Sequence, residues 1–355
     1  PQIVASETVA EAHIAAKLPL TTDGREDLRG LPIVAIDPAD ARDHDDAVWA
    51  APDDDPGNSG GYRAIVAIAD VSFYVRDGGA LDREARRRGN SVYFPDRVVP
   101  MLPEELSAGV CSLKAGEDRA AMACHLVIDK HGKVTSWRFA RALVRLRANI
   151  AYEVAQAIID GQKPLPLRGG VGVGSVEAAP HLADSPRSPT PSPEGEGEIL
   201  PALTNLWACW RLLAKARDGR APLALELPER QVILDDAGNI AEIRVRERLD
   251  AHRLIEDYMI AANVAAAKAL EAKKSHVMYR IHEPPSREKL VSLKDYLATF
   301  GQNFALGQVI TPATFNRLID GFSGDDRLDE IMTAILRSQT QAYYGPANVG
   351  HFGLA

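Results

Sequence analysis

Cysteine is scarce in this sequence, and long apolar runs are absent. The three cysteines, Cys111, Cys124 and Cys209, lie far apart and form no Cys-x-x-Cys pair. This spacing excludes a disulfide scaffold and a cysteine-rich zinc module, and it favours a reducing compartment, so we expect a cytoplasmic protein. No stretch approaches the ~18 consecutive apolar residues of a membrane span, which excludes an integral membrane protein. With 355 residues, 46% of them hydrophobic, the chain is long enough for one large domain or for two to three ordinary ones.

An excess of positive charge is also lacking, because the formal net charge is −8. The acidity is local, however. Residues 37–56 contain eight aspartates and one arginine, and the rest of the chain is close to neutral, with arginines gathered at residues 83–88 and 138–147. A carboxylate cluster repels itself unless cations or water compensate its charge. Beside arginine-rich segments, such a cluster predicts a site where a polyanion is cut with the help of a metal ion. The alternative is solvated surface charge.

Apolar patterns place strands in the first half of the chain and helices in the second, which predicts an α+β fold rather than alternating βαβ units. We expect strands at residues 31–36 and 62–69, and helices at residues 203–216 and 250–273. Residues 1–30 are expected to form an N-terminal linker region with a short helix. Residues 164–198 hold seven prolines and six glycines. That proportion predicts a disordered insertion.

The motif with the clearest chemistry is Asp37-Pro-Ala-Asp40-Ala-Arg-Asp43-His-Asp45-Asp46. Asp37 ends a predicted strand. In an extended segment, Asp43 and Asp45 point to one side and Asp46 to the other. If the chain turns back over Asp37, four carboxylates converge, and such hard oxygen ligands suit Mg²⁺ or Mn²⁺. Two such ions can activate a water and stabilise the leaving oxygen of a phosphodiester.

The acidic motif also allows other interpretations. It could be an acidic surface turn or a calcium loop, but the EF-hand pattern fails because Arg42 and Val48 occupy its sixth and twelfth positions. Phosphotransfer enzymes use Asp-x-Asp with a later Gly-Asp-x-x-x-Asp. Residues 324–329 fit the second element, whereas Asp37 does not open the first.

Four blocks of the sequence resemble the catalytic domain of the ribonuclease II/ribonuclease R (RNB) family. They are IDPADARDHDDAV, SVYFPDRVVPMLPEELSAGVCSLKAGEDRAAMAC, RLIEDYMIAANVAAA and QAYYGPANVGHFGLA. The SVYFP form is more similar to ribonuclease R. The resemblance covers residues 31–355 apart from the insertion. It implies an RNB-type catalytic domain of the α+β class, with a twisted, mostly antiparallel sheet or barrel surrounded by helices.

The resemblance also implies an activity. The family's enzymes are processive, hydrolytic 3′-to-5′ exoribonucleases that release nucleoside 5′-monophosphates from the 3′ end of single-stranded RNA with magnesium, for which manganese could substitute. Tyr93 matches the aromatic residue that stacks on the terminal base, a contact that tolerates any sequence. The family's four catalytic and metal-binding aspartates match Asp37, Asp43, Asp45 and Asp46.

Further RNA contacts are expected on the predicted helix at residues 250–273. His252, Glu256 and Asn263 share one stripe of that helix, where polar groups could meet 2′-hydroxyls. The alternative is a helix side that faces solvent. Tyr152 lies in a segment similar to one that contacts RNA in the family, although residues 149–151 read Asn-Ile-Ala where the family has Arg-Leu-Thr.

The chain ends before a Ser-Pro-Ile-Arg block whose arginine helps to stabilise the reacting phosphate in the family. It also lacks the family's flanking OB-type RNA-binding domains. The resemblance therefore implies a catalytic domain truncated at its C-terminal end. The competing hypothesis is a catalytically weak or inactive RNA-binding fragment.

Overall fold

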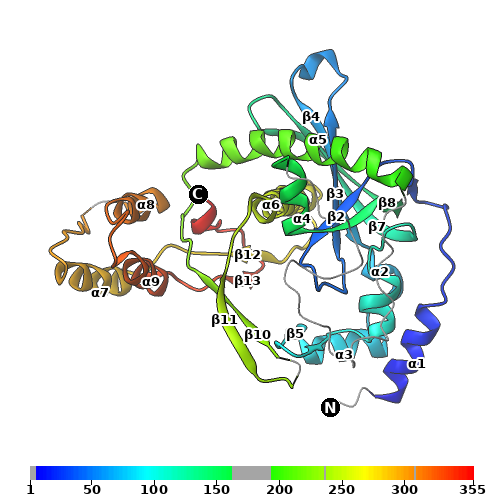
Figure 1. Cartoon of the computed structure of the whole chain (residues 1–355), viewed down its shortest axis with the longest axis horizontal. Helices are drawn as coiled ribbons and strands as arrows, with labels where there is room; N and C mark the ends of the chain where they lie inside the picture. The colour runs from blue at the N-terminus through cyan, green and yellow to red at the C-terminus, as the bar shows by residue number, and fades with distance from the viewer. Residues whose placement is uncertain (1–4, 162–192, 236, 308) are drawn as a thin grey trace. The chain divides into compact units, whose positions relative to one another are not determined.

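The computed structural model describes residues 5–161, 193–235, 237–307 and 309–355. These residues form two compact units (Figure 1). Unit 1 comprises Pro1–Leu212 and Arg230–Ala265, and unit 2 comprises Leu213–Glu229 and Ala266–Ala355. The expected insertion at residues 164–198 lies outside the described residues except for its last part. There the helix α5 (Pro193–Asp218) already begins, earlier than the sequence indicated.

A seven-stranded sheet forms the centre of unit 1. Its strand order is β1-β8-β7-β4-β3-β2-β9. The pairs β1–β8 and β2–β9 are parallel and the other neighbours are antiparallel, so the sheet is mixed. Along the order of the sheet, the strands are β1 (Glu26–Asp27), β8 (Val134–Arg145), β7 (Asp118–Ile128), β4 (Tyr62–Ala69), β3 (Asp46–Pro52), β2 (Val34–Asp37) and β9 (Ala148–Ala151).

This arrangement confirms the predicted α+β class, and it corrects the barrel form of the prediction. Among the described strands, β1 and β9 are the edges of the sheet and do not pair with each other, so the sheet stays open. The apolar run of β4 explains its central place. Residues 64–67 are at most 3% exposed because β3 and β7 flank them and both faces of the sheet are covered there.

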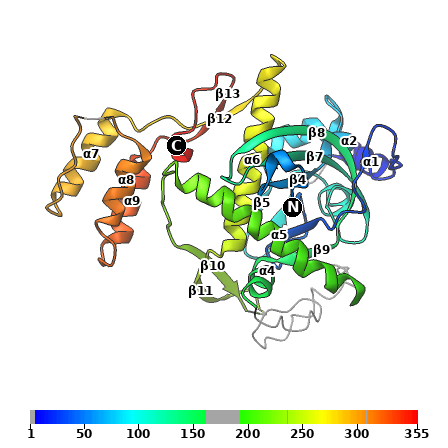
Figure 2. The same cartoon turned by 90° about the horizontal axis from the view of Figure 1, so that it is seen from above.

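One face of the sheet carries an apolar core, which is covered by α1 (Ser6–Ala15), α2 (Val71–Tyr74), α3 (Ala80–Arg88) and the π-helical turn η2 (Glu105–Val110). Within this cover, α1 contacts α3 and η2, and Figure 2 shows β7 and β8 of the sheet running side by side. Ala12 and Ala15 of α1 are buried in this core, and the Glu11 carboxylate accepts the Ala80 N–H at 2.6 Å at the start of α3. The N-terminal segment expected as a linker therefore contributes to the core.

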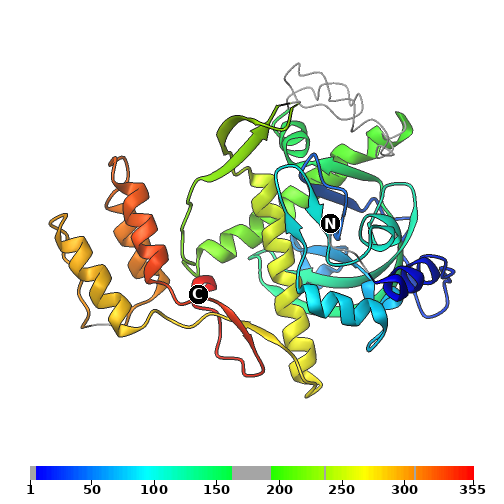
Figure 3. The ribbon, with the colours of Figure 1, turned by 90° about the horizontal axis from the view of Figure 1, so that it is seen from below.

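Within unit 1, the helix α6 (Asp250–Ala272) contacts both α4 (Tyr152–Ile159) and α5. The Trp210 indole of α5 donates to Asp257 of α6 at 2.8 Å, and the fully buried Tyr258 donates from its hydroxyl to the Leu206 carbonyl at 3.1 Å. The helix α6, yellow in Figure 3, agrees with the predicted helix at residues 250–273. Two hairpins complete the unit: β5 (Val92–Tyr93) with β6 (Val98–Val99), and β10 (Glu229–Leu234) with β11 (Ile240–Arg246).

Unit 2 is built around three helices. Leu297, Phe315 and Ile331 form part of its own buried core. The elements are α7 (Arg287–Ala298), α8 (Pro312–Asp320), α9 (Leu328–Ser338) and the strand pair β12 (Tyr279–Ile281) with β13 (Tyr343–Gly345). Across the described part of the chain, no helix is both long and apolar enough to cross a membrane.

Candidate active site

The acidic motif occupies the connection between two neighbouring strands in the sheet. Asp37 is the last residue of β2, and Asp46 is the first residue of β3. The two strands pair antiparallel, with Val34 opposite Val48, so the segment between them folds back over the end of β2. We call residues 37–46 the acidic loop. The chain thus turns back over Asp37, which is the arrangement that would bring the four carboxylates together.

The carboxylates of this loop act on one another electrostatically. Burial, and then the charges of Asp37 and Asp45, raise the pKa of Asp46 to about 6. Burial, and then the charges of Asp43 and Asp37, also raise the pKa of Asp45. The Oδ2 atom of Asp46 is buried and has no hydrogen-bond partner. An unpaired buried carboxylate oxygen is costly, which makes it a natural ligand for a cation.

Two side chains hold the other aspartates. His44 is only 5% exposed, and its Nδ1 lies 2.6 Å from Oδ2 of Asp37 in a hydrogen bond. The Tyr93 hydroxyl donates to Oδ2 of Asp43 at 2.9 Å. Tyr93 itself is 65% exposed, so its ring is available to a ligand and is not core packing. Sequence reasoning missed the role of His44, whose only signal was its position inside the motif.

The fit of a metal ion rests on these oxygens. Among the residues that the structure describes, no group of three or more His, Cys, Asp or Glu side chains stands ready to hold a metal ion. The donor set nevertheless suits a hard divalent cation. Burial and neighbouring negative charge raise the pKa of Asp45 and of Asp46, and Asp46 also has a buried oxygen without a partner, so positive charge would stabilise both side chains.

Tyr152 lies beside the acidic loop. It follows Ala151, the residue of β9 that pairs with Asp37 in parallel register. Burial, and then the charges of Asp37 and Asp46, raise the pKa of Tyr152 to about 12. Its ring stacks on His252, with the ring centres 4.0 Å apart and an angle of 18° between the planes.

The start of α6 is fixed by its own residues and by α4. Nδ1 of His252 accepts the Leu249 N–H at 3.1 Å, and Oε1 of Gln156 accepts the Ala251 N–H at 3.1 Å. These bonds satisfy backbone donors that a helix N-terminus otherwise leaves open. The structure therefore joins Tyr152 and His252 next to Asp37, a pairing that their separation in sequence concealed.

The other two predicted RNA contacts are less constrained. Glu256 is exposed on α6 and forms an ion pair with Arg248. Asn263 is exposed two turns farther along the same helix.

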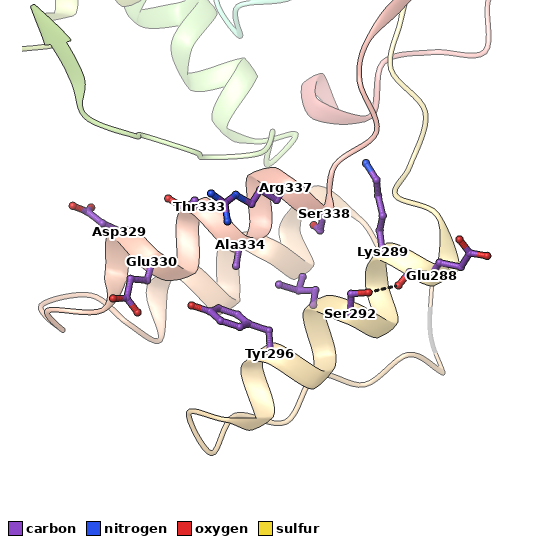
Figure 4. Close-up of a pocket in the computed structure, with 11 residues that line it drawn as sticks. Glu288, Lys289, Ser292, Tyr296, Asp329, Glu330, Thr333, Ala334, Arg337 and Ser338 are labelled. Atoms are coloured by element: carbon purple, nitrogen blue, oxygen red, sulfur yellow. Dashed lines mark hydrogen bonds between the residues drawn. The ribbon is translucent and has the colours of Figure 1, made fainter.

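Unit 2 contains a pocket that shares no residue with this site. It is formed between α7 and α9, with Tyr296 at its middle, Arg337 and Lys289 toward one end, and Glu330 toward the other (Figure 4). None of the side chains predicted from the sequence lines it.

Comparison with known proteins agrees with this geometry. The RNB domain family matches residues 25–355. The curated proteins named Ribonuclease R from Vibrio cholerae and Escherichia coli are each 38% identical over 332 residues, which cover 94% of this chain and 37% of theirs. Ribonuclease R of Aquifex aeolicus is 36% identical, over 93% of this chain and 43% of its own length. The chain thus spans less than half the length of these relatives.

Solved structures show the same fold. Mycoplasma genitalium RNase R in complex with ribose-methylated single-stranded RNA superposes with a TM-score of 0.82 at 24% identity, over 99% of this chain and 51% of that one. The complex of that enzyme with double-stranded RNA gives a TM-score of 0.83 at 24% identity, over 99% and 58% of the two chains. Yeast Ssd1, described as a pseudonuclease, gives 0.68 at 17% identity, over 95% and 38%. The fold alone therefore does not decide whether a chain is catalytic.

Proposed function

Because this chain belongs to the RNB domain family, we propose that it is the catalytic domain of a processive exoribonuclease. Its substrate is the 3′ end of single-stranded RNA, which it hydrolyses in the 3′-to-5′ direction to nucleoside 5′-monophosphates. The observation that carries the proposal is the acidic loop, in which Asp46 keeps a buried oxygen without a partner and feels the charges of Asp37 and Asp45. The names of the relatives support the same activity.

The residues that would hold magnesium, or manganese in its place, are Asp37, Asp43, Asp45 and Asp46. When bound there, the divalent ion lowers the pKa of the attacking water and neutralises the charge that develops on the leaving oxygen. His44 keeps one oxygen of Asp37 oriented, and the Tyr93 hydroxyl does the same for Asp43.

RNA would be held by side chains around this loop. The exposed ring of Tyr93 offers a face on which the terminal base can stack, and stacking accepts every base because each has a π-face. Tyr152 contributes a second aromatic group next to Asp37. Glu256 and Asn263 lie exposed on α6, where a carboxylate and an amide can hydrogen-bond 2′-hydroxyls and so distinguish RNA from DNA.

From the sequence, we propose that the catalytic domain comprises residues 31–355 and contains an insertion at residues 164–198. We also propose that the protein is cytoplasmic. Residues 1–30 were expected to be a linker. Because α1 packs into the core of unit 1, we extend the domain to include it.

The test uses this chain and a single-stranded RNA with a 5′ label and a free 3′-hydroxyl. With Mg²⁺ we expect mononucleotides to be released and the labelled strand to shorten from its 3′ end. The same RNA with a 3′-phosphate serves as a substrate control, and EDTA should stop the reaction. RNA binding without any release of mononucleotides would contradict the proposed function and favour the competing hypothesis of a non-catalytic RNA-binding fragment.

A further inference from the structure

The acidic loop is held from behind by a segment that sequence reasoning did not connect with it. We call residues 112–115 the brace. Oγ of Ser112, a fully buried residue, accepts the His44 N–H at 3.0 Å and donates to the Arg42 carbonyl at 3.3 Å. The Leu113 N–H donates to the His44 carbonyl at 2.8 Å. These hydrogen bonds fix the backbone on either side of Asp43 and immediately before Asp45.

The brace is held in turn by one side chain of β9. Oδ1 of Asn149 accepts the Ala115 N–H at 2.7 Å, and its Nδ2 donates to the Leu113 carbonyl at 2.9 Å. Asn149 stands opposite Ala35 of β2 in the parallel pair. The connection is therefore closed: β2 carries Asp37, β9 lies beside β2, and Asn149 reaches from β9 through the brace to the backbone that carries Asp43 and Asp45.

This closed connection restrains the acidic loop. The carboxylates of the acidic loop repel one another, so without an external restraint the loop would relax by moving Asp43 and Asp45 away from Asp37. The side chain of Asn149 and the brace supply that restraint through buried and half-buried hydrogen bonds, without contacting any of the four carboxylates themselves. Partners that orient ligands in this way typically change metal affinity by ~10–100-fold when they are removed.

We propose that Asn149 is a positioning residue that keeps the acidic loop arranged for a divalent cation, acting through the brace. This inference rests on the proposed function, because it assigns Asn149 a task toward the ion that the four aspartates would hold.

The chain contains a matched control. In unit 2, Oδ1 of Asn316 accepts the Ala224 N–H at 2.9 Å, and its Nδ2 donates to the Pro222 carbonyl at 2.7 Å. Asn316 thus makes the same amide clamp on two backbone groups that are two residues apart, and both asparagines are half-buried. The substitutions Asn149→Ala and Asn316→Ala remove equivalent hydrogen bonds, but only the first touches the restraint on the acidic loop.

The experiment measures Mn²⁺ binding to the whole chain by the electron paramagnetic resonance signal of the free ion, together with a melting curve in EDTA. We expect both variants to melt below the parent by comparable amounts. We expect Asn149→Ala to raise the Kd for Mn²⁺ by about tenfold or more, and Asn316→Ala to leave it unchanged. The Mg²⁺ concentration that gives half the maximal rate of RNA hydrolysis should rise in the same variant, with the KM for RNA unaltered.

Ser112→Ala provides a second route, because it removes the two hydrogen bonds of the Ser112 hydroxyl to the loop while the Leu113 N–H bond and Asn149 stay in place. Ser112→Ala should also raise the Kd for Mn²⁺, and it tests the positioning role if Asn149→Ala does not fold. If the parent binds Mn²⁺ and the folded brace variants bind it equally well, the positioning role is wrong although the proposed function stands. An equal loss of binding in Asn316→Ala would also overturn it, since the effect would then be general destabilisation. A folded parent that binds no Mn²⁺ would contradict the proposed function itself.

Discussion

Replacing Asp46 by asparagine should make the metal-free protein more stable at neutral pH. Asp46 is a carboxyl group whose pKa is raised from an ordinary 3.8 to about 6 by burial and by Asp37 and Asp45. Asparagine has nearly the same shape and no charge. The substitution therefore removes the repulsion and leaves the packing at the start of β3 in place.

The magnitude and its pH window follow from the pKa. Between pH 4 and pH 6 the folded protein keeps a proton on Asp46 that the unfolded chain has lost, so the stability of the parent falls as pH rises through this window. At about 1.4 kcal/mol per pKa unit, the full loss above pH 6 is about 3 kcal/mol. Below pH 4 both the folded and the unfolded state carry the proton on Asp46, and this loss of stability is absent. The stability gap between Asp46→Asn and the parent should thus be larger at pH 7 than at pH 4 by up to about 3 kcal/mol.

Urea unfolding of both proteins at pH 4 and pH 7 in EDTA measures this gap, and comparing the two pH values cancels any fixed cost of the asparagine amide. Adding Mg²⁺ at pH 7 should then stabilise the parent more than the variant, because the ion compensates the charge that Asp46→Asn has removed. A gap that is the same at both pH values, or that is smaller at pH 7, would refute the conclusion that Asp46 is held against its neighbours' charge.

Three other predictions concern single side chains. Asp45→Asn should abolish RNA hydrolysis while RNA binding in a filter assay stays close to that of the parent, and retention of more than about a tenth of the parent rate would argue against Asp45 as a ligand. Tyr93→Ala should lose ~1–3 kcal/mol of base contact, so that the smallest end product on a denaturing gel becomes longer. Tyr93→Phe loses the hydrogen bond to Asp43 but keeps the ring, so it should keep the product ladder whatever its rate. An unchanged ladder in folded Tyr93→Ala would exclude the stacking role. Arg25→Ala should destabilise the chain by ~3–5 kcal/mol in thermal or urea melts, because it removes the guanidinium that lies 2.9 Å from the buried Asp70. A loss below about 1 kcal/mol would show that the other partners of Asp70, Ser72 and Arg141, compensate its charge.

The parts that could be predicted from the sequence are local in the chain. The apolar run of β4 indicates a strand by its shortness and its β-branched residues, and the apolar stripe of α6 indicates a helix by its periodicity. The acidic loop is ten consecutive residues, so its turn over Asp37 could be expected from a strand that runs directly into the motif.

What could not be predicted depends on contacts between distant residues. Nothing near Asn149 in the sequence indicates that its amide binds the backbone of residues 113 and 115, and the stacking of Tyr152 on His252 depends on how α4 meets α6. The N-terminal helix was expected in a linker because its polar composition conceals the two small buried alanines that pack on the core. The open sheet likewise depends on which strands become edges, a property of pairing that no single strand carries.

The parallel pairing of β2 with β9 has a consequence for the biosynthesis of the protein. Val34 pairs with Ala148, whereas β3 with β4 and β7 with β8 pair with their immediate successors in the chain. Pairings between distant segments form slowly, because the entropy of closing a long loop is lost before the contacts of the pair contribute any stability. During translation the four aspartates leave the ribosome well before Asn149 and β9 exist. A nascent chain that ends before β9 would therefore carry the complete acidic motif without the restraint of Asn149, so the braced arrangement of the acidic loop would arrive with β9 and not with the motif itself.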